Sequence, residues 1–371
     1  MSAYKKLKSL DVYRLLAMFL VMWGHLIGTG MNAYEIPYVI DGVMLNPIID
    51  SSNFKLQFLE AFLYYKLNTQ AAVLGVAMFF VCTGYLVPSM LQRYSRKQFL
   101  INRIFRIFPV LVASTLFWGV VVFISQGIVI EPKQYIASFT LLFQPLGIAT
   151  FMGVLWTLTI EVLFYLVAAL CRKIDERTIV SIYIIIVLLG VIYREFPNRH
   201  VYNLFYDFRY MGFILLGSAV YCAKNSAYSS KIGKFVVIGL PFVLNLLIFQ
   251  IGRDVFGDDT TYPNFFTHLF PLLIMLGLLC LEERNHVLFD RIPTPIYRIS
   301  ELAYPVYLTH VCVGLTCMFW LAKIGMNRYV VVLMGVVSSL AVAKVMALLI
   351  ERPAIMWSRK LIVAEQNSLM K

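Results

Sequence analysis

The sequence predicts an all-α fold, a polytopic bundle of about ten transmembrane helices. Of the 371 residues, 60% are hydrophobic and only 14% are charged, whereas ordinary soluble proteins contain roughly 25% charged residues. A chain this apolar cannot cover its own surface in water, so lipid must be its solvent. The apolar residues also gather in runs of roughly 20, the length that a helix needs to cross a ~30 Å hydrocarbon core.

The apolar runs define the expected spanning helices in chain order. They cover about 11–30, 72–92, 104–126, 154–172, 178–194, 207–223, 234–251, 265–282, 299–322 and 329–350. The first run follows Lys5, Lys6 and Lys8, as in a signal peptide, but no small-residue cleavage site comes after it, so we expect a permanent helix. The segment 134–149 is also apolar. Counting it as a span would break the alternation of charge between the loops, so we expect an interfacial or re-entrant helix there.

The loops differ in their content of basic residues, which predicts the orientation. One alternate set of loops, together with both chain ends, holds 21 of the 32 Lys and Arg residues, and the other set holds nine. The positive-inside rule places the richer set and both termini in the cytoplasm. The stretch 31–71 then lies outside, where it can cap the bundle. No linker or repeat divides the sequence, so we expect a single domain over 1–371 with its core at about 8–355.

Composition and motifs argue against several functions. The net charge of +12 comes from residues scattered through loops, without the basic stripe of a nucleic-acid-binding protein. The six cysteines lie within or at the ends of apolar runs, and no CxxC pair or His/Cys ligand spacing occurs. We therefore expect neither a disulfide framework nor a metal site. Membrane lipid is the expected surrounding, and nucleic acid is not an expected partner.

Two ionisable residues in the first helix, Arg14 and His25, mark a candidate site. Such residues cost at least ~2.5–3.5 kcal/mol each at the bilayer centre. They are eleven positions apart, about three helical turns, so they are expected on one face roughly 16 Å apart. Arg14 would lie near the cytoplasmic surface and His25 toward the outer one. The alternative is that Arg14 snorkels to the headgroups and His25 bonds a carbonyl; the pair on one face favours function.

A carboxylate is expected at the depth of His25. Glu161 follows about seven residues into a helix that runs from outside to inside, and His25 lies about five residues below the same surface. A neutral histidine oriented by a carboxylate is a common general-base arrangement. The alternative is a structural His–Glu pair that ties two helices together.

Other polar residues are candidates for donor binding or site support. Arg103 and Arg106 are spaced i, i+3 at the cytoplasmic start of the third span, and planar guanidinium groups suit phosphate oxygens. Binding of anionic lipid is the alternative reading. Glu301 begins the ninth span, and His310 near mid-membrane is equally well read as a site residue or as a buried hydrogen-bonding histidine.

Six segments in order resemble the acyltransferase 3 family of bacterial membrane O-acyltransferases, which act on surface polysaccharides and related glycans. They are SLDVYRLLAMFLVMWGH, FFVCTGYLV (79–87, with Thr83 where serine is usual), NRIFRIFP (102–109), LWTLTIEVLFYL (155–166), SELAYPVYLTH (300–310) and ERP (351–353). Each segment alone is weakly specific. Together, on the expected helical frame, they cover about residues 8–355.

The resemblance implies an enzyme that takes acyl groups, usually acetyl, from cytoplasmic acyl-CoA. It implies that His25 is the essential histidine, that Glu161 is a site carboxylate and that Arg14, Arg103 and Arg106 contact CoA or stabilise the site. It also implies the bacterial inner membrane. Some relatives carry a fused SGNH esterase-like domain, and without one we expect direct acylation of a saccharide or lipid-linked saccharide. In the mechanism that we expect, Trp156 or Tyr165 stabilises the oxyanion.

Two other functions remain open from the residues. A transporter or flippase for lipid-linked sugars would use the same polar residues as a pathway, although no inverted repeat or pair of Gly/Pro-broken helices appears. A membrane glycosyltransferase or polymerase would need large outer loops and acidic catalytic pairs. The acyl group, the acceptor hydroxyl and the oligomeric state are open as well.

Overall fold

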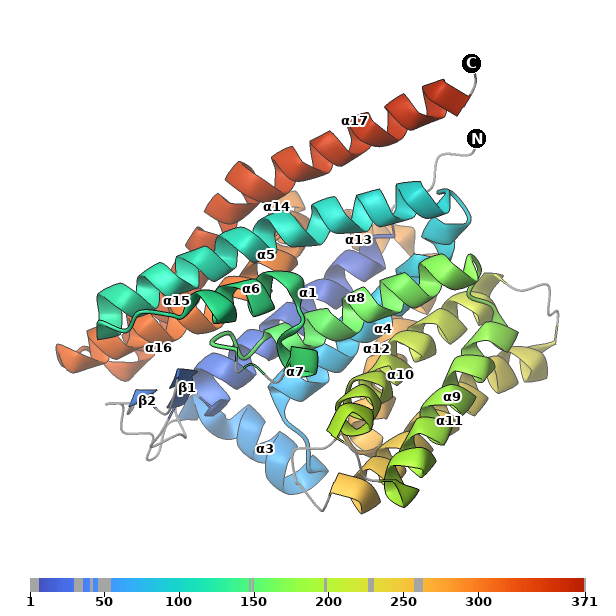
Figure 1. The fold of residues 1–371 in the computed structure, drawn as a ribbon, viewed down its shortest axis with the longest axis horizontal. Helices are drawn as coiled ribbons and strands as arrows, with labels where there is room; N and C mark the ends of the chain where they lie inside the picture. The colour runs from blue at the N-terminus through green and yellow to red at the C-terminus, as the bar shows by residue number, and fades with distance from the viewer. Residues whose placement is uncertain are drawn as a thin grey trace. The chain divides into compact units, whose positions relative to one another are not determined.

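The described chain is almost entirely helical (Figure 1). The structure, a computed structural model, describes residues 7–29, 36–40, 43–45, 55–146, 148, 150–196, 199–225, 230–256 and 263–369. It contains two compact units. The first unit comprises Met1–Val21, Leu59–Ser89 and Ile174–Ala303. The second unit comprises Met22–Phe58, Met90–Lys173 and Tyr304–Lys371.

The first unit contains most of the middle of the chain. Its helices are most of α1 (Lys8–Trp23), α3 (Phe58–Leu67), α4 (Ala71–Leu91), α9 (Glu176–Glu195), α10 (Arg199–Asn225), α11 (Lys231–Phe256), α12 (Phe265–Arg284), α13 (His286–Asp290) and α14 (Thr294–Ser300). Helices α9, α10 and α11 pack on one another. Glycines let α4 and α10 approach closely: a Cβ on Gly84 would lie 1.8 Å from the Ile214 oxygen, and one on Gly217 would lie 2.0 Å from the Val81 oxygen.

The second unit is built around α5. It contains the π-helical segment η1 (Gly24–Thr29), β1 (Ile36–Ile40), β2 (Val43–Leu45), the 3₁₀ turn η2 (Lys55–Gln57), α5 (Arg96–Gln126), α6 (Pro132–Thr140), α7 (Phe143–Leu146), α8 (Leu155–Cys171), α15 (Ala303–Lys323), α16 (Arg328–Met346), the π-helical segment η3 (Ala347–Glu351) and α17 (Arg352–Leu369). Ser95 and Gln98 form a capping box that starts α5. In Figure 1, α17 runs beside α5, and Lys97 pairs with Glu365 at 3.6 Å.

The predicted all-α membrane fold is confirmed, but the count of ten spans is not. In the part of the chain that the structure describes, eight helices are long and apolar enough to cross a membrane. The two other expected spans, 154–172 and 207–223, coincide with α8, which has only 17 residues, and with α10, which is not among the eight. The helix α10 carries the fully buried Arg209, one of the polar residues that lower its apolarity.

Of two segments outside the expected spans, one is too short to span, as predicted, and the other departs from the all-α prediction. The apolar stretch 134–149 forms α6 and α7, of nine and four residues, which are too short to span, as expected for an interfacial or re-entrant segment. Leu141 ends α6 in the left-handed conformation, at φ 57°. Within 31–71, strands β1 and β2 form an antiparallel pair that the all-α prediction lacks. Much of the rest of that stretch, with Glu35, Asp41 and Asp50, lies outside the described residues.

Candidate active site

The expected base, His25, lies on a π-helical turn. α1 keeps α-helical geometry as far as Trp23, and η1 begins at Gly24, so His25 is the second residue of the wider helix. Short π segments interrupting α-helices occur frequently at functional sites. His25 is partly exposed, unlike most residues around it in the sequence.

The partner of His25 is His310 of α15. His25 Nδ1 lies 3.0 Å from His310 Nε2, and the two ring centroids are 5.1 Å apart. His310 is fully buried, at 0% exposure. Its Nδ1 donates to the backbone oxygens of Val306 and Tyr307, at 2.9 and 3.0 Å. Sequence reasoning left His310 open between a structural histidine and a site residue, and the structure brings it to the candidate base.

Helix α15 is tied to two neighbouring segments just before His310. Trp118 of α5 donates its indole N–H to the Leu308 oxygen at 2.8 Å. The hydroxyl of Tyr307 lies 2.6 Å from the hydroxyl of Thr157 and donates to the Val154 oxygen at 3.0 Å. Sequence reasoning missed these links, although Thr157 and Tyr307 lie in the two motif segments that contain Glu161 and His310.

Glu161 lies in a polar group on α8. Tyr165, one turn later on the same helix, donates its hydroxyl to Glu161 Oε1. Arg103 Nη1 in turn approaches the Tyr165 hydroxyl at 3.4 Å. The structure therefore brings Glu161, Tyr165 and Arg103 together, while the imidazole of His25 is bonded to His310. The expectation that Glu161 orients His25 stays a prediction. Trp156 is the second residue of α8 and is partly buried.

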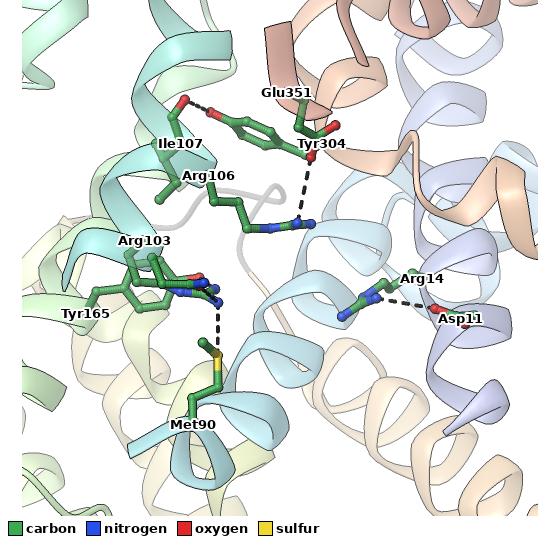
Figure 2. A network of polar contacts seen from close by, with 10 residues as sticks. Asp11, Arg14, Met90, Arg103, Arg106, Ile107, Tyr165, Tyr304 and Glu351 are labelled. Atoms are coloured by element: carbon green, nitrogen blue, oxygen red, sulfur yellow. Dashed lines mark hydrogen bonds and ion pairs between the residues drawn. The ribbon is translucent and has the colours of Figure 1, made fainter. Parts of the chain in front are cut away.

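Arg103 projects from the first turns of α5 onto neutral neighbours (Figure 2). Its Nη2 donates to Asn102 Oδ1 at 2.8 Å and lies 2.9 Å from Met90 Sδ. The guanidinium carbon is 5.2 Å from the ring centroid of Tyr165. Its Nε is buried and has no hydrogen-bond partner among the described residues. Buried polar groups are normally bonded, so this unsatisfied N–H makes Arg103 a candidate for ligand binding.

Arg106 is held by an acidic residue. Its Nη1 lies 3.7 Å from Glu351 Oε1, and the Glu351 side chain is only 5% exposed. Glu351 is the last residue of η3, the second π-helical segment of this unit. Beside it, Tyr304 donates its hydroxyl to the Ile107 oxygen at 2.8 Å (Figure 2). Sequence reasoning quoted Glu351 only as a motif residue, because its distance from Arg106 in the sequence hid the ion pair.

Arg14 belongs to the first unit and pairs with its own helix, at 3.4 Å from Asp11 Oδ1 (Figure 2). The start of α1 is fixed by the buried Glu282, which accepts from the Lys8 and Ser9 amides at 2.9 and 3.1 Å. The face that Arg14 is expected to share with His25 stays a prediction. Glu301 is exposed in the turn before α15.

The described residues include no group of three or more His, Cys, Asp or Glu that could hold a metal ion. The arrangement in the second unit instead offers a partly exposed imidazole, a carboxylate, a phenol and two guanidinium groups. These are groups for proton transfer and anion binding. They suit an acyl transfer in which a proton moves and an anionic donor must be held.

A comparison with protein families shows which family the chain belongs to. The model of acyltransferase 3, described as an acyltransferase domain, matches residues 7–348. The chain belongs to the acyltransferase 3 family. With its apolar helices, it is therefore a membrane acyltransferase.

One curated relative is similar over part of the chain. It is nodulation protein 10 of Rhizobium leguminosarum bv. viciae, 31% identical over 124 residues, which cover 28% of this chain and 34% of the relative. The match thus spans about a third of that relative's length. No solved structure matches.

Proposed function

We propose that this membrane acyltransferase transfers an acetyl or other short acyl group from cytoplasmic acyl-CoA to a hydroxyl of a saccharide. The acceptor is a cell-surface glycan or its lipid-linked precursor, and the enzyme works in the bacterial inner membrane with both termini in the cytoplasm. The observation that carries the proposal is the pairing of the partly exposed His25 with the buried His310, 3.0 Å apart, in the unit that also holds the two arginines.

The arginines at the start of α5 would hold the CoA phosphates. Arg103 supports this role because its partners are neutral and its buried Nε has no partner among the described residues. Arg106 is 39% exposed despite its pair with Glu351, so a phosphate can reach it. Guanidinium groups bind phosphate oxygens through charge-assisted hydrogen bonds. We also propose that Arg14 contacts the acyl-CoA donor, and this part of the proposal rests only on the resemblance to the acyltransferase 3 family.

The reaction that fits these groups is direct acyl transfer. The imidazole of His25 takes the proton of the acceptor hydroxyl, and the oxygen attacks the thioester carbonyl. The carbon–sulfur bond then breaks, and the thiolate of CoA takes the proton from the imidazolium, which leaves an ester and free CoA. Trp156 and Tyr165 are candidate donors to the oxyanion. Glu161 would favour the positive charge that develops on His25.

Loss of acylation after removal of His25 tests the proposal. The surface glycans of cells that express wild-type protein, the H25A variant or no protein would be compared by mass spectrometry, at equal amounts of protein in the membrane. Acyl groups that appear with wild type and disappear with H25A are expected. The matched control is H286A, which removes an exposed histidine of the other unit. Acylation at the wild-type level by H25A would refute the proposal, and a glycan change without any acylation would favour a flippase.

A further inference from the structure

The hydrogen on His310 can be assigned from its partners. Its Nδ1 lies 2.9 and 3.0 Å from the backbone oxygens of Val306 and Tyr307. A carbonyl oxygen only accepts hydrogen bonds, so the Nδ1 of His310 carries a hydrogen and donates it. The ring is also fully buried within a membrane helix, where a charge is very costly. A neutral ring with a hydrogen on Nδ1 has a lone pair on Nε2.

This assignment fixes the hydrogen on His25 as well. The Nε2 of His310 is an acceptor, and the nitrogen 3.0 Å from it is Nδ1 of His25. Nδ1 of His25 must therefore carry a hydrogen and donate it to His310. In neutral His25 the lone pair is then on Nε2, the nitrogen on the opposite side of the ring.

We propose that His310 is the positioning residue of the base: it holds His25 in the tautomer whose Nε2 can accept the proton of the acceptor hydroxyl. The inference rests on the proposed function, in which His25 is the base. It assigns to a neutral imidazole the part that a carboxylate plays in many catalytic triads. His310 touches neither substrate in this role, because it is buried behind His25.

The packing around the pair explains how two helices far apart in sequence keep this distance. Gly314 lies one turn after His310 on the same face of α15. A Cβ at Gly314 would lie 2.6 Å from Leu26 Cδ2, and Leu26 follows His25 directly. The missing side chain lets η1 approach α15. The bond from Trp118 to the Leu308 oxygen, 2.8 Å, fixes α15 from the other side.

The pairing also determines the path of the proton. The hydroxyl proton moves to Nε2 of His25 while the Nδ1 hydrogen stays in its bond to His310. When the carbon–sulfur bond breaks, the thiolate takes the proton back from Nε2. Transfer onward to His310 would create a charged ring in a fully buried position, so His310 orients the base without carrying the proton.

Two substitutions of His310 test the inference. H310L removes the acceptor and leaves the Nδ1 hydrogen of His25 without its partner, whereas H310Q can place an amide oxygen near the former Nε2. Initial rates of CoA release from acetyl-CoA would be measured on the purified protein, with the glycan fraction that wild type acylates. We expect kcat of H310L to fall at least ~100-fold, as for loss of a working general base. Its KM for acetyl-CoA should stay within about two-fold of the wild-type value. The kcat of H310Q should be at least about ten-fold higher than that of H310L.

The matched control is a second buried histidine. His268 in α12 is also 0% exposed, and its Nδ1 bonds its own helix at the Asn264 oxygen, 2.7 Å away. H268L therefore removes a buried imidazole of the same kind without touching His25, and it should keep kcat within about three-fold. Equal losses in H268L and H310L, or a wild-type kcat in H310L, would overturn the inference. The proposed function would survive either result if H25A remains inactive.

A direct measurement covers the case in which H310L fails to fold. The two tautomers of a histidine give different ¹⁵N NMR signals, which can be measured on wild-type protein that contains ¹⁵N-labelled histidine. Comparison with the H25Q spectrum assigns the signals of His25. We expect His25 with its hydrogen on Nδ1 and with a bare Nε2. A hydrogen on Nε2 of neutral His25 would overturn the inference whatever the activity of the variants.

Discussion

Replacing Arg103 with glutamine should weaken binding of acyl-CoA and leave the chemical step largely intact. The neighbours of Arg103 among the described residues are neutral: it bonds Tyr165, Met90 and Asn102 and lies over the Phe99 ring, and its Nε has no hydrogen-bond partner among the described residues. A bound phosphate would therefore gain charge-assisted hydrogen bonds without breaking an ion pair. Net gains of about 1.5–3 kcal/mol are typical of one such bond. Each 1.4 kcal/mol of binding free energy corresponds to a tenfold change in affinity. KM for acetyl-CoA should therefore rise roughly 10- to 150-fold.

The assay is the rate of CoA release as a function of acetyl-CoA concentration, and its control is R96Q. Arg96 begins the same helix and donates to the Leu170 oxygen at 2.8 Å, but it is exposed. R96Q removes one positive charge two turns earlier in the helix. It therefore measures how far the loss of charge alone raises KM, an effect that salt screens. A wild-type KM in R103Q, or equal changes in R103Q and R96Q, would refute a direct contact between Arg103 and the donor.

Three other predictions concern α8, α4 and α3. Y165F removes the hydroxyl that bonds Glu161, so kcat should fall about ten-fold for one lost hydrogen bond of about 1–1.5 kcal/mol, measured as CoA release; an unchanged kcat would remove Tyr165 from the site. G84L should prevent stable folding, because even a Cβ there would lie 1.8 Å from a backbone oxygen, whereas G277L in α12 has open space and should be recovered normally by size-exclusion chromatography. Burial raises the pKa of the Glu60 carboxyl in α3 above its ordinary value of 4.5, so the folded state binds more protons and stability falls as pH rises from 4.5 toward the raised value. E60Q should abolish that fall in thermal melts, and an unchanged pH dependence would contradict it.

The spans were predictable because hydrophobicity over about 20 residues is a local property. The same property explains the miscounted regions. Arg209 makes α10 less apolar than a typical span, and α8 is short because it begins only at Leu155, after the loop that follows α7. Strands β1 and β2 flank the sequence Asp41-Gly42, a dipeptide typical of two-residue hairpin loops, and the all-α prediction overlooked this signal.

The members of the candidate site stay a prediction, and the side-chain contacts among them could not be predicted. Counting residues into two expected spans predicts the depth of His25 and Glu161, but depth does not say which way a side chain faces around its helix. The π turn at Gly24 changes that direction for His25, and no sequence rule indicates it. The partner of His25 lies 285 positions later in the chain, and Glu351 reaches Arg106 from another π segment. Such contacts depend on the packing of whole helices.

If the protein binds CoA through Arg103 and transfers the acyl group with His25, CoA should stabilise the folded protein. Thermal unfolding of the purified protein with increasing CoA tests it most directly, because a ligand that binds only the folded state stabilises it by about 2.7 kcal/mol at 100 times its Kd. We expect CoA to raise the melting temperature of wild type and of H25A equally, and R103Q to need much more CoA for the same rise. If millimolar CoA did not raise the melting temperature of wild type, CoA would not be a ligand of this protein.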